Sequence, residues 1–147
     1  MNNLVKHLES ELLQLEKATE ILRYSYEKCK NINLIEGVGH QELESFEALT
    51  GRFARMSDML IQRIFRLIDN LDLEDSGTVR DRINRAEKKG LISSADIFIE
   101  IRILRNEIAH EYKSETIYAL FEKVVHLTPH LFKAVESTRE YASKYFI

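Results

Sequence analysis

The chain has 147 residues, of which 44% are hydrophobic and 31% are charged, with one proline and five glycines. This composition excludes a disordered linker, and no apolar run reaches the roughly 18 residues of a membrane span. The net charge of −3 excludes a protein that is strongly basic as a whole, as many nucleic-acid binders are. The acid-rich N-terminus shows no export signal and the lone Cys29 cannot form an internal disulfide, so we expect one cytoplasmic domain over residues 1–147.

Two long helices are predicted in the N-terminal half. Residues 3–30 carry an apolar stripe at helical spacing, formed by Leu8, Leu12, Leu15, Leu22, Tyr26 and Cys29. Residues 31–39 interrupt the pattern with two glycines. Residues 40–69 resume it through Phe46, Leu49, Phe53, Met56, Leu60, Ile64 and Leu67. Gly51 lies inside this second pattern, and we expect it to soften or kink the helix there.

Two shorter helices are predicted after the acidic, turn-prone residues 71–77. The third helix begins at Thr78–x–x–Asp81, whose spacing suits an N-terminal capping arrangement, and it ends at Gly90. A similar Ser93–x–x–Asp96 precedes the fourth helix. The buried face of that fourth helix is marked by Ile97, Ile101, Leu104 and Ile108.

A fifth helix, capped by Ser114, is predicted to complete the chain. Pro129 is expected to end or kink it near Thr128. Its buried face is marked by Tyr118, Phe121, Val125, Leu131, Phe132 and Val135. No strand-like alternation competes with these patterns. The predicted fold is therefore all-α, an antiparallel up-down bundle of four to five helices without a domain boundary.

Four polar side chains gather late in the fourth predicted helix, at Arg105, Asn106, His110 and Tyr112. A solvated helix face with its cations near the C-terminal end would account for any one of them alone. In a regular helix Arg105 and His110 differ by about 140° around the axis, so they point poorly at one small target. Either the arginine wraps round, the helix distorts, or a second copy of the chain supplies the complementary group.

Such a set of side chains suits the cleavage of an RNA phosphodiester. Histidine titrates nearest neutrality, so it can take the proton of a 2′-hydroxyl or give one to the leaving 5′-oxygen. Arginine presents a planar, permanently charged fork to phosphate oxygens, where charge accumulates in the transition state. The nucleophile lies within the substrate, and the chemistry therefore needs no metal.

The pattern Arg105-Asn106-x-x-x-His110-x-Tyr112 resembles the signature of the HEPN superfamily, an arginine and a histidine separated by about four to six residues. The asparagine and the tyrosine make it similar to the HepT-like toxins, which are paired with minimal nucleotidyltransferase (MNT) antitoxins in type VII-like toxin–antitoxin modules. The motif covers eight residues. The surrounding helical pattern, with the motif on the penultimate helix, agrees across most of the chain.

The resemblance implies a homodimer whose facing motifs form a cleft, and a metal-independent endoribonuclease toxin neutralised by a cognate nucleotidyltransferase antitoxin. Arg105 and His110 would be the catalytic pair, and Asn106 would support them. Tyr112 would accept AMP from the antitoxin, and this AMPylation would block the cleft with bulk and negative charge. Two alternatives stay open, a non-catalytic nucleotidyltransferase substrate-binding subunit and a structural bundle with an accidental motif.

A second basic feature lies on the second predicted helix. Its arginines fall within about 80° around the axis, beside the apolar face. These arginines are Arg52, Arg55, Arg63 and Arg66. They are candidates for contact with RNA or with an acidic partner, and the alternative is that they form an ordinary charged exterior. His126 and His130 have the spacing of a helical metal pair, but no third ligand is evident, and we predict no metal or other cofactor.

Overall fold

The computed structural model describes residues 3–110 and 117–147, and every regular element among them is helical. The first two elements are α1 (Asn3–Cys29) and a short 3₁₀ turn (Leu34–Glu36). A long rod follows without a break, made of α2 (His40–Asp58), a π-helical segment (Met59–Ile64) and α3 (Phe65–Leu71). The remaining elements are α4 (Val79–Lys89), α5 (Ala95–Ala109), α6 (Ile117–Ala142) and a 3₁₀ turn (Ser143–Phe146).

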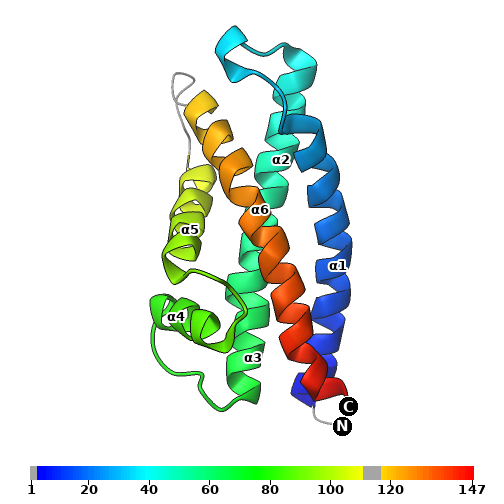
Figure 1. Cartoon of the computed structure of the whole chain (residues 1–147), viewed down its shortest axis with the longest axis vertical. Coiled ribbons are helices and arrows are strands. Elements are labelled where there is room, and N and C mark those ends of the chain that lie inside the picture. The colour runs from blue at the N-terminus through cyan, green and yellow to red at the C-terminus, as the bar shows by residue number, and fades with distance from the viewer. Residues whose placement is uncertain (1–2, 111–116) are drawn as a thin grey trace.

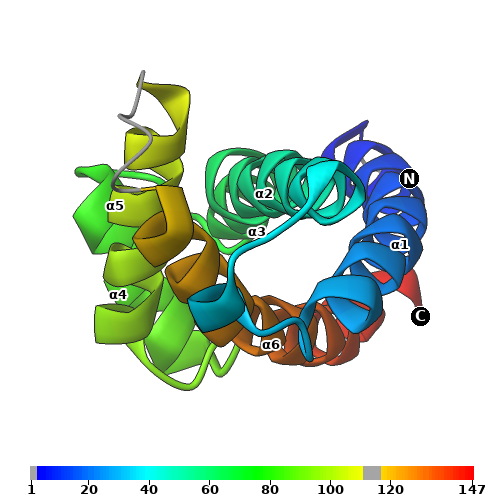
Figure 2. The ribbon, with the colours of Figure 1, turned by 90° about the horizontal axis from the view of Figure 1, so that it is seen from above.

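The helices α1, α5 and α6 and the long rod form an up-down bundle (Figure 1). α1 packs against the long rod and α6, and α5 packs against the same two from the other side. Seen from above, α1 and α5 therefore lie at opposite edges of the bundle (Figure 2). The short α4 lies across the lower end of the rod and contacts α5. The prediction of an all-α helical bundle is confirmed, and none of the described helices is long and apolar enough to cross a membrane.

The predicted apolar stripes form the core of this bundle. All seven residues of the stripe predicted on the second helix are buried, and so are Leu8, Leu15, Leu22 and Cys29 on α1. The rings of Phe46 and Phe121 stack at 4.8 Å between centroids and so join α2 to α6. Each such side chain contributes about 1.5–3 kcal/mol on full burial, so the core accounts for most of the favourable free energy of folding. The other stripe residues lie at the edge of the core: Tyr118 is 40% exposed, and Leu12, Tyr26, Ile97, Ile108 and Val125 are partly buried.

The helix ends follow the capping signals closely. The Thr78 side chain accepts from the Asp81 backbone N–H, and the Asp81 carboxylate accepts from the Thr78 N–H, which completes the predicted capping box. α4 ends at Gly90, whose φ of 80° lies in the left-handed region that glycine tolerates. The cap of α5 is Ser94, one residue after the predicted Ser93. The predicted cap Ser114 lies outside the described residues.

Neither Gly51 nor Pro129 ends its helix. Gly51 lies in regular α-helix, and the rod departs from α geometry only at the π segment, eight residues later. Pro129 neither ends α6 nor stands near its end, because the helix runs on to Ala142. The neighbouring Leu127 and Leu131 are both buried, so packing holds the helix together across the missing N–H of Pro129.

The buried face of the rod widens at the π segment. Before it, the buried stripe follows Leu49, Phe53, Met56 and Leu60. After it, Phe65 and Ile68 are buried beside the stripe residues Ile64 and Leu67. Arg82 on α4 supports the segment, because its Nη1 donates to the Ile61 carbonyl at 3.2 Å and to Gln62 Oε1 at 3.4 Å. π segments of this kind are frequent at functional sites.

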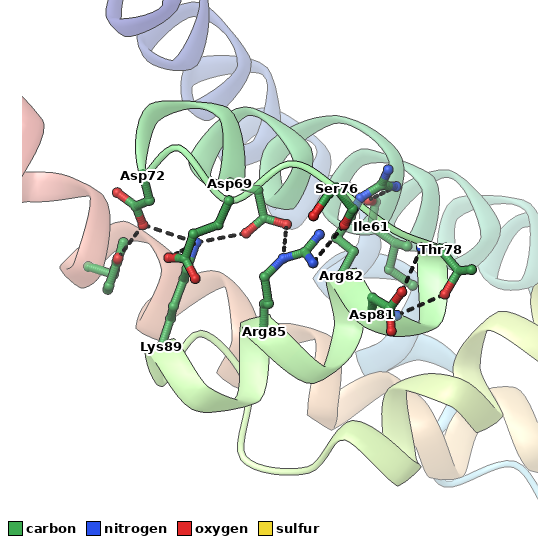
Figure 3. Close-up of polar contacts among 11 residues, drawn as sticks. Ile61, Asp69, Asp72, Ser76, Thr78, Asp81, Arg82, Arg85 and Lys89 are labelled. Atoms are coloured by element: carbon green, nitrogen blue, oxygen red, sulfur yellow. Dashed lines mark hydrogen bonds and ion pairs between the residues drawn. The ribbon is translucent and has the colours of Figure 1, made fainter.

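Below the π segment, α3 and α4 are joined by an ion-pair network formed by Asp69, Asp72, Arg85 and Lys89 (Figure 3). The Lys89 Nζ lies 2.7 Å from Asp69 and 3.0 Å from Asp72, and the Arg85 Nε lies 3.0 Å from Asp69. Burial by itself would raise the pKa of Asp72, but hydrogen bonds from Tyr141, Tyr145 and Lys89 hold it below its usual value. The network thus ties α4 and the end of α6 to the rod.

Candidate functional site

The predicted motif borders a pocket of about 440 Å³ between α5 and the long rod. α5 contributes Arg102, Arg105 and Asn106, which are three or four residues apart and therefore share one face of the helix. The rod contributes residues from the end of α2 and from the π segment: Ser57, Asp58, Ile61, Gln62 and Arg63. We call this site the Arg105 pocket. It combines arginine side chains with amide and hydroxyl groups, as an anion-binding site requires.

Arg105 is held within the pocket by a two-point ion pair. Its Nε lies 2.7 Å from Asp58 Oδ1, and its Nη2 lies 2.9 Å from Asp58 Oδ2. Hydrogen bonding to Asp58 raises the pKa of Arg105 above its usual value, so the guanidinium stays charged. The pairing occupies only the Nε side of the planar group. The Nη1 side keeps its donors for another ligand.

His110 is the C-cap of α5 and follows its last helical residue, Ala109. Its backbone has φ of −96° and ψ of 154°, which is extended, and its N–H donates to the Glu107 carbonyl at 3.2 Å. The helix therefore distorts at the motif, and the angle of about 140° expected from a regular helix does not apply. The His110 side chain is exposed and does not line the Arg105 pocket. A single chain thus brings Arg105 and Asn106 together without His110, and Tyr112 lies outside the described residues.

The predicted arginine stripe is divided by the fold. The Arg52 Nη1 lies 2.6 Å from Ser25 Oγ on α1 and 3.4 Å from the Ile21 carbonyl, so this arginine braces two helices. Arg55 is exposed on α2 and does not line the Arg105 pocket. Arg63 does line that pocket, and its Nη1 also lies 3.6 Å from the buried Glu11. Arg66 is exposed one turn further along the rod.

Several residues of the pocket were not predicted from the sequence. Arg102 could have been found, because it lies one turn before Arg105 on the same face of the fourth helix. Gln62 could likewise have been found as the neighbour of Arg63 in the predicted stripe. Asp58 gives no local signal, since its partner Arg105 lies 47 residues away in the chain.

The chemistry available in this pocket is anion binding by arginine with an amide group beside it. Among residues 3–110 and 117–147, no three histidine, cysteine, aspartate or glutamate side chains gather as metal ligands would. Within the motif, the described residue suited to acid–base work is His110, which does not line the pocket. No protein-family model, curated protein or solved structure matches this chain.

Proposed function

We propose that this chain is a metal-independent endoribonuclease of the HEPN type, a toxin that acts as a homodimer and is neutralised by a nucleotidyltransferase antitoxin. The Arg105 pocket is the observation that carries the proposal. It holds the motif arginine in a fixed orientation with donors to spare, and it places Asn106 and two further arginines beside it. These groups suit a phosphodiester whose negative charge increases in the transition state.

The proposed reaction is an attack of the RNA on its own phosphate. The 2′-oxygen forms a bond to phosphorus and the bond to the 5′-oxygen breaks, leaving a 2′,3′-cyclic phosphate and a 5′-hydroxyl. Arg105 binds the non-bridging oxygens through its Nη1 side. His110 takes the 2′-hydroxyl proton or returns one to the leaving oxygen, which is worth about 10²–10⁴-fold in rate.

A second copy of the chain completes the proposed site. Within one chain, His110 does not line the pocket that contains Arg105 and Asn106. His110 is nevertheless exposed at the end of α5, where a facing protomer can reach it. We therefore assign Arg105 and Asn106 of one protomer and His110 of its partner to each cleft. Transfer of AMP to Tyr112 by the antitoxin would then close the cleft.

The test is a metal-free RNA cleavage assay in EDTA with Arg105→Ala, His110→Ala and an equal mixture of the two. We expect each variant alone to lose about 10²-fold or more of the activity. The mixture should regain activity after subunit exchange, because one of the two sites in a mixed dimer keeps both residues. His126→Ala removes an exposed histidine from α6 and serves as the control. Full activity in His110→Ala would overturn the proposal, and variants that never complement would overturn the shared site.

One observation favours a second candidate, a non-catalytic subunit that presents a substrate to the nucleotidyltransferase. The separation of His110 from the pocket in one chain leaves arginines suited to anion binding without the motif histidine beside them. This candidate predicts firm binding to the nucleotidyltransferase and no RNA cleavage by the wild-type dimer. Growth arrest on expression that His110→Ala relieves would exclude it.

A further inference from the structure

We propose that Arg66, together with Arg102, which also lines the Arg105 pocket, forms a second phosphate-binding site, so that the substrate is an RNA strand with a phosphate flanking the one that is cleaved. The inference rests on the proposed function, which it extends by naming the substrate as an internal stretch of RNA. It gives a role to Arg66 of the predicted arginine stripe and to Arg102, which the motif does not contain.

The geometry joins this second site to the first. Arg102 lies one turn before Arg105 on α5 and lines the Arg105 pocket together with Gln62 and Arg63. Arg66 follows Gln62 by four residues on the rod and so continues the same face. On α4, the Arg82 guanidinium donates to the Ile61 carbonyl, as Figure 3 shows, and to Gln62 Oε1. One anionic chain can therefore run from Arg105 along the rod to Arg66.

The charges around this site are unbalanced. Burial lowers the pKa of Arg82, and the positive charges of Arg66, Arg85 and Arg102 lower it further, while Asp69 only partly opposes them. The acids nearest the site are already engaged. Asp58 pairs with Arg105, Asp69 pairs with Arg85 and Lys89, and Glu11 lies 3.6 Å from Arg63.

The two arginines assigned to the site are free to bind. Arg66 and Arg102 are both exposed, and neither forms an ion pair with any residue that the structure describes. Repulsion among like charges is relieved when an anion binds between them. The fold thus maintains a cluster of positive charge that a ligand, and not the protein, neutralises.

A nucleic-acid strand fits this surface better than an acidic protein does. A protein interface has an apolar centre, often with aromatic side chains. Of the large apolar side chains exposed in the described residues, such as Leu13, Tyr24 and Ile103, none lines the Arg105 pocket. Arginines repeated along one face instead match a ligand with one negative charge per nucleotide.

The test measures how salt affects binding of a labelled oligouridylate of about 12 nucleotides with 2′-O-methyl groups, which His110 cannot cleave because the nucleophile is blocked. Fluorescence anisotropy between about 50 and 200 mM NaCl gives the slope of log K against log salt. Each phosphate contact on a single strand contributes about 0.7 to that slope. We expect Arg66→Gln and Arg102→Gln each to reduce it by about 0.7, and the double variant by about 1.4.

Arg80→Gln is the matched control. It removes the same charge from α4, at a position about 200° round the helix from Arg82, and it should leave the slope unchanged. Unchanged slopes in Arg66→Gln and Arg102→Gln would overturn the second site. So would variants that bind the oligonucleotide normally but lose binding to polyglutamate, since this would mark an acidic protein partner. If the wild-type protein does not cleave RNA but Arg66→Gln and Arg102→Gln still reduce the salt slope, the nuclease proposal is rejected and the second phosphate site is supported.

Discussion

Two groups of charged residues lie along the same rod, and they differ in their balance of acids and bases. In the ion-pair network, the two cations face two aspartates, and the side chain of Asp69 is 3% exposed. Three arginines line the Arg105 pocket, and among the described residues only two acids pair with them, Asp58 with Arg105 and Glu11 with Arg63 at 3.6 Å. The Arg105 side chain is 32% exposed. The first group is closed and neutral, and the second is open and positive. The number of cations alone does not distinguish a structural group from a binding group, whereas their balance against the acids that pair with them does.

The largest effect is expected at the network. Lys89→Ala removes a cation that is 8% exposed and leaves Asp69 and Asp72 without it. Breaking a buried pair from one side costs about 3–5 kcal/mol, which lowers the melting temperature by roughly 10 °C. Thermal unfolding followed by circular dichroism measures this. Lys88→Ala, an exposed neighbour, should change little, and equal melting temperatures in the two variants would erase the distinction between the groups.

An intermediate effect is expected at Asp58, and on activity, not stability. Asp58→Asn loosens the two-point hold on Arg105, and misplacement of this kind costs about 10–100-fold in rate. Stability should change by about 1 kcal/mol or less, because both side chains of the pair are about one-third exposed. Kinetics on the metal-free assay should show a lower kcat with KM little changed.

Glu100→Gln is the control for Asp58, since Glu100 is an exposed acid of α5 outside the Arg105 pocket. If Asp58 only braces the fold, Asp58→Asn will lower the melting temperature and leave kcat per folded molecule intact. That result would show that Asp58 has a structural role, like the aspartates of the ion-pair network, and does not position Arg105 for catalysis.

The smallest effect is expected at Arg52, which belongs to the predicted stripe but braces α1. Arg52→Ala removes the hydrogen bonds to Ser25 and Ile21 and should cost about 1 kcal/mol of stability. Affinity for the 2′-O-methyl oligouridylate should stay at the wild-type value. Chemical denaturation and anisotropy measure the two quantities, with Arg55→Ala as the control that should alter neither. Loss of RNA affinity in Arg52→Ala would show that Arg52 contacts RNA, as the predicted stripe suggested.

Apolar periodicity predicted the helical architecture because burial leaves a repeating mark on the sequence. The stripe on α1 and the stripe from Phe46 to Leu67 were both found this way. The capping box at Thr78 was equally visible, since its two partners are three residues apart. The cap of α5 is Ser94 and not the predicted Ser93, since adjacent serines offer the same chemistry and only the backbone decides between them.

The candidate site was predictable only in part. Arg105 and Asn106 of the motif line a pocket, but the Arg105–Asp58 contact spans 47 residues and follows from packing alone. The π segment was invisible because the four-residue spacing from Met56 to Leu60 and Ile64 fits an ordinary α-helix equally well. α5 ends at Ala109, so His110 does not follow the helical spacing from which its direction was predicted. The roles of His110 and Tyr112 stay predictions.

The π segment also sets how much change in length the rod can accept. Its wider turn holds one residue more than an α-helical turn would, and the whole of α3 is rotated accordingly. Deleting a single residue between 59 and 64 would restore a plain α-helix and leave the direction of α3 unchanged, because the wider turn already takes up that residue. Arg66 would stay beside the Arg105 pocket, and Asp69 would stay beside Lys89. The rod can therefore lose one residue at the π segment while the arginines and the ion-pair network remain in register with each other.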